Sequence, residues 1–298
     1  MKLLRLSTVL CLLTSTALAP QEAPVYKLNV NVDLVELHVS VVDDKDRTVS
    51  GLAQDNFRIL ENRVEQPIKV FKHEDIPVSL GLVIDNSRSI EPRKARLDAA
   101  ALSFVRKSNA EDEAFIVHFD FDARLAQDFT GDEEVLEQVL GRVKPFGQTA
   151  LYDAMILAID QMEKAKYPKR AILLITDGLD NVSRQNLNDV LDRLKRSRVA
   201  VYPVGLLSAL EGEKAELDLL KIAEASGGKA YFPENPEQAK TMMERIARDL
   251  REQYTLGYSS SADRDGSWRS VRVEIIPPPG LPKNLNANYR HGYYGPLP

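Results

Sequence analysis

The chain has 298 residues, of which 44% are hydrophobic and 28% are charged. This is the composition of a folded globular chain with room for one large or two modest domains, and it excludes disorder, collagen and repeat arrays. The 39 basic and 44 acidic side chains leave a net charge of −5, so no overall positive field attracts nucleic acid or an anionic membrane. We therefore expect partners to bind at a defined site.

Residues 1–23 have the layout of a secretory signal peptide. Lys2 and Arg5 precede an apolar run, and small residues follow at Ala17 and Ala19. We expect an exported protein that is periplasmic, attached to the cell envelope or secreted. The alternative is an uncleaved anchor, although the run is short for a membrane span, and no later segment is apolar enough to be one.

The cleavage position and the cysteine count refine this interpretation. Pro20 disfavours a cut directly before it, so the cut is expected elsewhere, with the position after Ala23 as the candidate. The single cysteine, Cys11, lies in the leader. Its position excludes disulfides, a cysteine-rich zinc site and a thiol nucleophile in the mature protein.

Residues 24–76 alternate between apolar and polar side chains in short runs, which indicates half-buried β-strands. We predict four strands in this segment. Along the first predicted strand the apolar side chains switch from one face to the other, which predicts a β-bulge near Val35 and Glu36. Asn62 and Arg63 are predicted to form the tip of a hairpin.

Residues 77–253 follow a different pattern, in which strands alternate with helices. Residues 78–85 form a nearly continuous apolar run, which is typical of a strand covered on both faces. Two strands within residues 115–129 are joined too tightly for a crossover and must be antiparallel. The pattern predicts a doubly wound, mostly parallel α/β sheet with one antiparallel edge strand. Helices are expected at 92–108, 133–141, 150–164, 186–195, 214–225 and 236–251, and further strands at 170–176, 199–205 and 229–232.

Residues 254–298 return to strands, of which we predict three. Seven strands in total suffice for an immunoglobulin-like β-sandwich, so we expect one discontinuous domain from residues 24–76 and 254–298, with the α/β domain inserted. The alternative is two separate β-appendages, which would each bury too little apolar surface to be stable.

Oxygen-bearing side chains are predicted at one edge of the α/β sheet. Asp85, Ser87 and Ser89 follow the strand 78–85, Asp177 follows the strand 170–176, and Thr149 precedes a helix. Carboxyl ends of strands in an open α/β sheet are where ligands bind. An all-oxygen set favours Mg²⁺, with Mn²⁺ or Ca²⁺ as alternatives, and zinc is not expected. Five protein ligands leave at least one of the six positions around an octahedral cation open for a carboxylate from another molecule.

The segments DNSRS (85–89), GQTALYDA (147–154) and ITDGLDN (175–181) resemble, in the same order, the three loops of the metal-ion-dependent adhesion site in von Willebrand factor type A domains. The resemblance covers about residues 78–251. It implies direct metal contacts from Ser87, Ser89 and Thr149, water-mediated or switching contacts from Asp85 and Asp177, and a partner acid that completes the shell.

The flanking β-segments further resemble bacterial exported proteins that carry such a domain. The sequence departs from the family pattern at Arg88, where many members have glycine, and at Ile90. Arg88 is expected either to pair with the incoming acid or to lie in solvent. Asp153 is expected to be a supporting carboxylate and not a ligand.

The sequence has no Gly-x-Ser-x-Gly nucleophile motif and no phosphate-binding glycine loop, and His118 is expected to be structural. We therefore expect a protein-binding or adhesion module that is not an enzyme, with a protein partner that supplies an Asp or Glu. One alternative is a metal-dependent hydrolase or phosphatase that uses Asp85 and Asp177. Another is a structural envelope module without metal, in which the five residues are caps and turns.

Overall fold

The computed structural model describes residues 34–107, 109, 111–207 and 212–298. The predicted signal peptide and the first residues of the predicted sandwich lie outside the described residues. Within the described ranges, no helix is long and apolar enough to cross a bilayer.

A five-stranded sheet forms the centre of the α/β part, in the order β7-β6-β5-β8-β9. All neighbours are parallel except β6 and β7, which are antiparallel because only residues 120–122 join them. This confirms the mostly parallel sheet with one antiparallel edge strand. The strands are β5 (Val78–Asp85), β6 (Glu113–Phe119), β7 (Ala123–Thr130), β8 (Lys169–Thr176) and β9 (Val199–Gly205).

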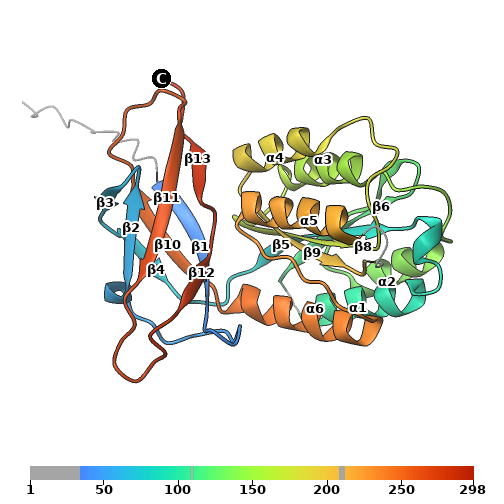
Figure 1. Ribbon diagram of the computed structural model, residues 1–298, viewed down its shortest axis with the longest axis horizontal. Coiled ribbons are helices and arrows are strands. Elements are labelled where there is room, and N and C mark those ends of the chain that lie inside the picture. Colours follow the sequence, from blue (N-terminus) through green and yellow to red (C-terminus); the bar gives the residue numbers. More distant parts are fainter. Residues whose placement is uncertain (1–33, 108, 110, 208–211) are drawn as a thin grey trace, which may run out of the picture. The chain divides into compact units, whose positions relative to one another are not determined.

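Helices cover both faces of this sheet (Figure 1). One face carries α1 (Lys94–Arg106), α2 (Glu133–Arg142) and α6 (Pro236–Arg251), and the other carries α3 (Leu151–Met162), α4 (Leu187–Arg196) and α5 (Gly212–Ser226). Along β5, Leu82 and Ile84 pack into the first core and Val83 into the second. The continuous apolar run of β5 therefore reflects burial on both faces, as expected.

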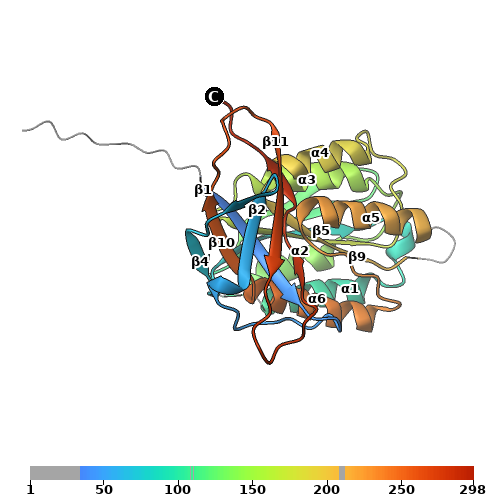
Figure 2. The same cartoon turned by 60° about the vertical axis from the view of Figure 1, so that its left-hand side comes forward.

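Two four-stranded antiparallel sheets are built from the two ends of the chain (Figure 2). Their orders are β12-β1-β10-β4 and β13-β11-β2-β3, so each sheet combines strands from both ends. Leu37, Ile59, Tyr254 and Val273 belong to one core shared by the two sheets, which confirms a β-sandwich. The strands are β1 (Leu34–Val42), β2 (Phe57–Glu61), β3 (Val64–Gln66), β4 (Val70–Lys72), β10 (Tyr254–Ser259), β11 (Trp268–Ile275), β12 (Asn286–Asn288) and β13 (Gly292–Tyr294). The immunoglobulin-like class of this sandwich and the domain boundaries stay predictions.

Three local predictions differ from the structure. Four strands follow the α/β layers instead of three, because β12 pairs with β1 and β13 pairs with β11 of the other sheet. The segment 229–232 forms only an isolated bridge, between Tyr231 and Val204. The bulge near Val35 and Glu36 is also wrong, since β1 pairs with β10 without a register shift.

The apparent change of face in β1 has a simple cause. Leu34 is 39% exposed and lies outside the core that receives Leu37. From Val39 to Val42, all side chains are buried, because β1 is covered on both faces there. The predicted hairpin tip is confirmed, since Asn62 and Arg63 have φ of 48° and 70° between β2 and β3.

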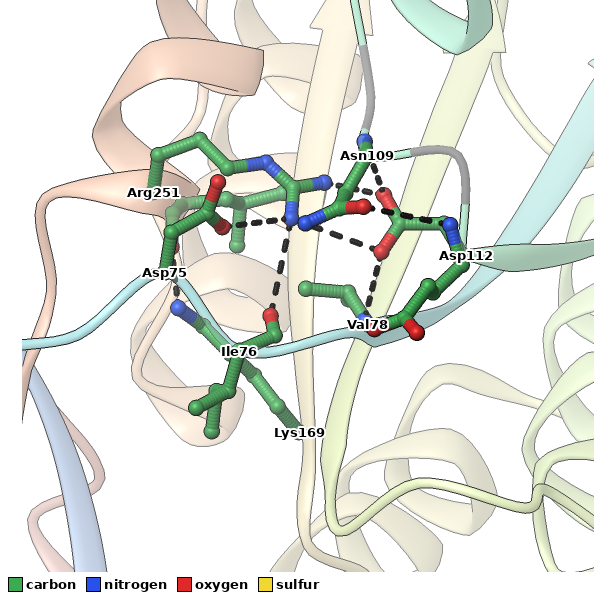
Figure 3. Close-up of polar contacts among 9 residues, drawn as sticks. Asp75, Ile76, Val78, Asn109, Asp112, Lys169 and Arg251 are labelled. Atoms are coloured by element: carbon green, nitrogen blue, oxygen red, sulfur yellow. Dashed lines mark hydrogen bonds and ion pairs between the residues drawn. The ribbon is translucent and has the colours of Figure 1, made fainter.

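Arg251, the last residue of α6, holds the segment that leads into β5 (Figure 3). Its Nη1 donates to Asp75 Oδ1 at 2.9 Å and to the Ile76 carbonyl at 3.5 Å, and its Nη2 donates to the Asp112 carboxylate. Asp112 Oδ1 also accepts the backbone N–H of Val78 at 2.7 Å. One guanidinium thus ties the segment that begins the α/β layers to the helix that ends them.

His118 in β6 is fully buried, and neither ring nitrogen has a hydrogen-bond partner among the described residues. Burial, and then the positive charges of Lys94 and Arg124, lower the pKa of His118 from 6.5 to about 3, against the opposing charge of Asp120. Because the unfolded chain takes up this proton at higher pH than the folded chain, the contribution of neutral His118 is complete above pH 6.5 and is lost as the pH falls toward 3.

His118→Leu should therefore flatten the acid side of the stability profile. Urea unfolding of both proteins at several pH values between pH 7 and about pH 4 should show a difference in unfolding free energy that changes steadily in favour of the variant as the pH falls. Parallel profiles would contradict the assignment of an uncharged, buried imidazole.

Candidate metal site

Asp85 is the last residue of β5, and its carboxylate is held from two sides. Its Oδ1 accepts the backbone N–H of Ser87 at 2.7 Å, and its Oδ2 accepts the Thr176 hydroxyl at 2.7 Å. The residue has no exposed surface. The end of β5 and the end of β8 are therefore joined through this carboxylate.

A chain of oxygen atoms continues from Ser87 to the end of β8. Ser87 Oγ and Ser89 Oγ lie 3.0 Å apart, and the Ser89 hydroxyl donates to Asp177 Oδ1 at 2.8 Å. Ser89 belongs to the short 3-10 turn η2 (Arg88–Ile90), which returns its side chain toward β8. The structure thus brings together four of the five predicted residues: Asp85, Ser87, Ser89 and Asp177.

Thr149 reaches the same edge on the loop that precedes α3. The Phe146 N–H donates to the Asn86 carbonyl at 2.7 Å, which fixes this loop beside the loop after β5. The Thr149 N–H donates to Asn181 Oδ1 at 2.9 Å, and the Asn181 N–H donates to the Thr149 carbonyl at 3.1 Å. Thr149 is only 4% exposed, yet its hydroxyl makes no hydrogen bond within the described residues. This oxygen has unused lone pairs.

The electrostatics of the site favour a bound cation. Burial, together with the negative charge of Asp177, raises the pKa of Asp85 from 3.8 to about 6, against the hydrogen bonds from Ser87 and Thr176 that lower it. A cation between the two carboxylates would offset both costs. Two carboxylates and three hydroxyls, all of them oxygen donors, fit Mg²⁺ or a similar hard cation.

Histidine and cysteine take no part in this site. In the described part of the chain, no group of three or more His, Cys, Asp or Glu side chains is placed to hold a metal ion. A cation bound by Asp85 and Asp177 therefore depends on the hydroxyls of Ser87, Ser89 and Thr149. Such a donor set differs from that of a catalytic zinc centre.

Arg93 is a charged residue of the site that the sequence motifs did not predict. Its Nη1 lies 3.2 Å from Asp177 Oδ2, while the other oxygen of Asp177 accepts the Ser89 hydroxyl. The sequence held one indication that Arg93 lies near the site: it follows Ser89 by four residues, which is about one helical turn. Arg88 is exposed and makes no side-chain hydrogen bond to a described residue, and both roles expected for it stay predictions.

Other polar side chains support the loops. The Asp153 carboxylate accepts the N–H groups of Arg184 and Gln185 at 3.1 and 3.0 Å. Asp180 Oδ2 accepts the N–H of Tyr152 at 3.1 Å, in the first turn of α3. These carboxylates satisfy backbone groups at a helix start and in a loop, as expected for Asp153.

The fold and the polar loops define an open α/β domain whose carboxyl edge is lined with carboxylates and hydroxyls. Residues 80–179 match the family model of the von Willebrand factor type A domain. The chain therefore contains a von Willebrand factor type A domain.

Solved structures agree with this fold. A von Willebrand factor type A protein from Catenulispora acidiphila superposes with a TM-score of 0.52 and 13% identity, over 90% of this chain and 75% of its own. A mutant of the PilB minor pilin from Streptococcus sanguinis gives 0.51 and 12%, over 59% and 62%. Proximal thread matrix protein 1 from the mussel byssus gives 0.50 and 15%, over 64% and 50%. At these identities the likeness shows a shared fold. No curated protein matches the sequence at a significant level.

Replacement of Arg93 should strengthen cation binding. Arg93→Gln removes the positive charge that competes for Asp177, and we expect the Mg²⁺ dissociation constant to fall roughly two- to fivefold, the range set by a partly exposed ion pair. Isothermal calorimetry with MgCl₂ measures this change. Arg96→Gln is the matched control, because Arg96 lies in the same helix region but pairs with Glu237 at 3.4 Å. Weaker Mg²⁺ binding by Arg93→Gln would contradict the competition.

Proposed function

We propose that this protein is an exported protein-binding module that docks an acidic side chain of a partner on a divalent cation. Mg²⁺ is the expected cation, and Mn²⁺ and Ca²⁺ are alternatives. The observation that carries the proposal is the convergence of three separate segments on one oxygen-lined edge, with an unused hydroxyl at Thr149. The proposed ligands are Asp85, Ser87, Ser89, Thr149 and Asp177.

The charge of the site explains why a partner acid would bind. The two carboxylates of Asp85 and Asp177 balance a divalent cation, and Arg93 adds one positive charge. Five protein groups leave one position of an octahedral shell open. A partner carboxylate would fill that position and would neutralise the remaining charge.

An exposed aromatic pair lies next to the proposed docking position. Phe121 and Phe146 are 44% and 64% exposed, and their ring centroids are 5.7 Å apart in an edge arrangement. The backbone N–H of Phe146 is bonded to the Asn86 carbonyl, so the pair borders the loop that carries Ser87. Aromatic side chains at the centre of an interface supply much of its binding energy. We infer that the partner acid is flanked by apolar side chains.

The hydrolase alternative requires a general base beside the cation. His118 cannot serve, because it is fully buried and lies within β6. Von Willebrand factor type A domains are usually non-catalytic adhesion modules, which favours binding over hydrolysis. The structural alternative without metal differs from the proposal in a direct way, because it predicts no cation uptake.

Cation binding is tested by a substitution that removes the negative charge of one proposed ligand and keeps the size of its side chain. Asp85→Asn keeps an acceptor for the Ser87 N–H, and the Thr176 hydroxyl can accept from the new amide group. The substitution removes the negative charge, so Mg²⁺ affinity should fall at least about tenfold. Thr149→Val should weaken binding less, because it deletes one neutral ligand. Calorimetry with MgCl₂ measures both, and thermal unfolding verifies the fold. Asp122→Asn is the matched control, since Asp122 is an exposed carboxylate after β6 with no predicted role. Absence of cation uptake by the wild type would refute the proposal.

The partner surface is tested separately from the metal. Phe146→Ser should leave Mg²⁺ affinity unchanged and should weaken capture of an envelope partner by about ten- to a hundredfold, the usual effect of an aromatic anchor. The assay is binding of that partner to immobilised protein in Mg²⁺ and in EDTA. Val64→Ser is the control, because Val64 is 59% exposed on the β2–β3 hairpin of the sandwich. Equal capture in EDTA would exclude docking through the cation.

A further inference from the structure

A second polar site lies at the opposite end of the same parallel strands. A cavity of about 270 Å³ opens at the amino ends of β8 and β9. Lys169, Arg170, Arg198 and Arg290 contribute four positive charges to its lining. Glu36 is the one carboxylate residue of the lining among the described residues. With eight residues in β8, this cavity is roughly 25 Å from Asp177, from the rise per residue of a strand.

None of these four cations has an ion-pair partner in the described parts of the chain. Within the described ranges, no carboxylate oxygen lies within 4.0 Å of the charged nitrogens of Lys169, Arg170, Arg198 or Arg290. The neighbouring Arg251 is the contrast, because Asp75 and Asp112 pair with it directly, as Figure 3 shows beside Lys169. The positive charge that faces the cavity is therefore not neutralised by direct contact with an acid.

Three of the four cations donate hydrogen bonds to backbone carbonyl groups, which are neutral. Two of the three, Lys169 and Arg170, lie at the start of β8. Lys169 Nζ donates to the carbonyl of Leu250. Arg170 Nε donates to the Tyr167 carbonyl at 3.2 Å. Arg198 makes no side-chain hydrogen bond to a described residue and is exposed, so its guanidinium is free to turn toward a ligand.

Arg290 is positioned by close backbone packing. Gly227, after α5, has φ of 78°, and a Cβ at this position would lie 2.3 Å from the Arg290 nitrogen. The guanidinium of Arg290 donates to the carbonyls of Gly292 and Lys195 at 2.6 and 3.1 Å. Glycine is therefore required where the sandwich segment that carries Arg290 meets the end of α5.

The groups around the cavity influence one another as like charges do. Burial, and then the charge of Arg198, lower the pKa of Arg290 to about 10. Burial and then the charge of Arg251 lower the pKa of Lys169 to about 8, against the opposing charges of Asp75 and Asp112. An anion in the cavity would relieve this repulsion.

His38 also lines the cavity. Its pKa is lowered to about 4 by burial and by the charge of Lys169, so the imidazole is neutral at pH 7 and adds no charge. At neutral pH the described residues of the lining therefore carry four cations against the one carboxylate of Glu36.

We propose that this cavity binds a small oxyanion of the phosphate class, either inorganic phosphate or a small phosphate monoester. Three of the four cationic side chains carry guanidinium groups, which suit phosphate oxygens, and a dianion offsets most of the net charge of the lining. The volume suits a small molecule better than a folded partner. This site is separate from the proposed metal site and does not depend on it.

The test uses the full mature chain in EDTA, with inorganic phosphate and glycerol phosphate as probes. Calorimetry at about 150 mM NaCl should show one saturable site with a dissociation constant below roughly 1 mM, and phosphate should raise the unfolding temperature. Arg198→Gln should weaken binding at least about tenfold, because it removes one of four facing charges. In phosphate-free buffer this variant should be at least as stable as the wild type, since the repulsion is reduced.

Two control variants test whether the anion binds at this cavity. Arg142→Gln lowers the net charge equally at an exposed position in α2 and should bind phosphate as the wild type does. Asp85→Asn should also bind phosphate normally, so failure of the metal site leaves this result intact. The proposal is overturned by absence of saturable binding, by unchanged binding in Arg198→Gln, by acetate binding as tightly as phosphate, or by binding only to phosphatidylglycerol vesicles.

Discussion

The buried carboxylate of Asp85 is the interaction on which the candidate metal site depends. It ends the strand at the centre of the parallel sheet and accepts hydrogen bonds from Ser87 and Thr176, so it joins strand ends that are 91 residues apart in sequence. Burial and the nearby Asp177 make its negative charge costly, as its raised pKa shows. A site that concentrates negative charge in this way is suited to a cation.

A parallel sheet covered on both faces leaves its two ends as the places for polar chemistry. In this protein the two ends of β8 carry opposite charge. The carboxyl ends of β5 and β8 present Asp85 and Asp177 with hydroxyl groups, whereas the amino ends of β8 and β9 present Lys169, Arg170 and Arg198. The strands between them are apolar, so each end is an independent electrostatic environment.

The sandwich depends on the α/β layers for the placement of its strands. Both of its sheets combine strands from the two ends of the chain, so neither end can complete a sheet alone. Gln253, between α6 and β10, donates to the Ser40 hydroxyl and to the Tyr202 hydroxyl, both at 3.1 Å. Together with Arg251, it fixes the place where the chain returns to the sandwich.

The sequence by itself determined the α/β order, the antiparallel edge, the shared sandwich and the loops that carry the oxygen-bearing residues. The α/β order and the antiparallel edge follow from local periodicity, because continuous apolar strands, amphipathic helices and tight turns are set by nearest neighbours. The shared sandwich follows from the number of strands at the two chain ends, and the loops follow from their place at the ends of strands and helices. The leader, the domain boundaries and the metal roles of Asp85, Ser87, Ser89, Thr149 and Asp177 stay predictions. Tertiary structure alone decided the pairing of Arg93 with Asp177, the unused hydroxyl of Thr149, the division of residues 286–294 between two sheets and the cations gathered around Arg290. Each of these depends on which distant groups meet, and that is set by how the elements pack and not by the spacing of residues along the chain.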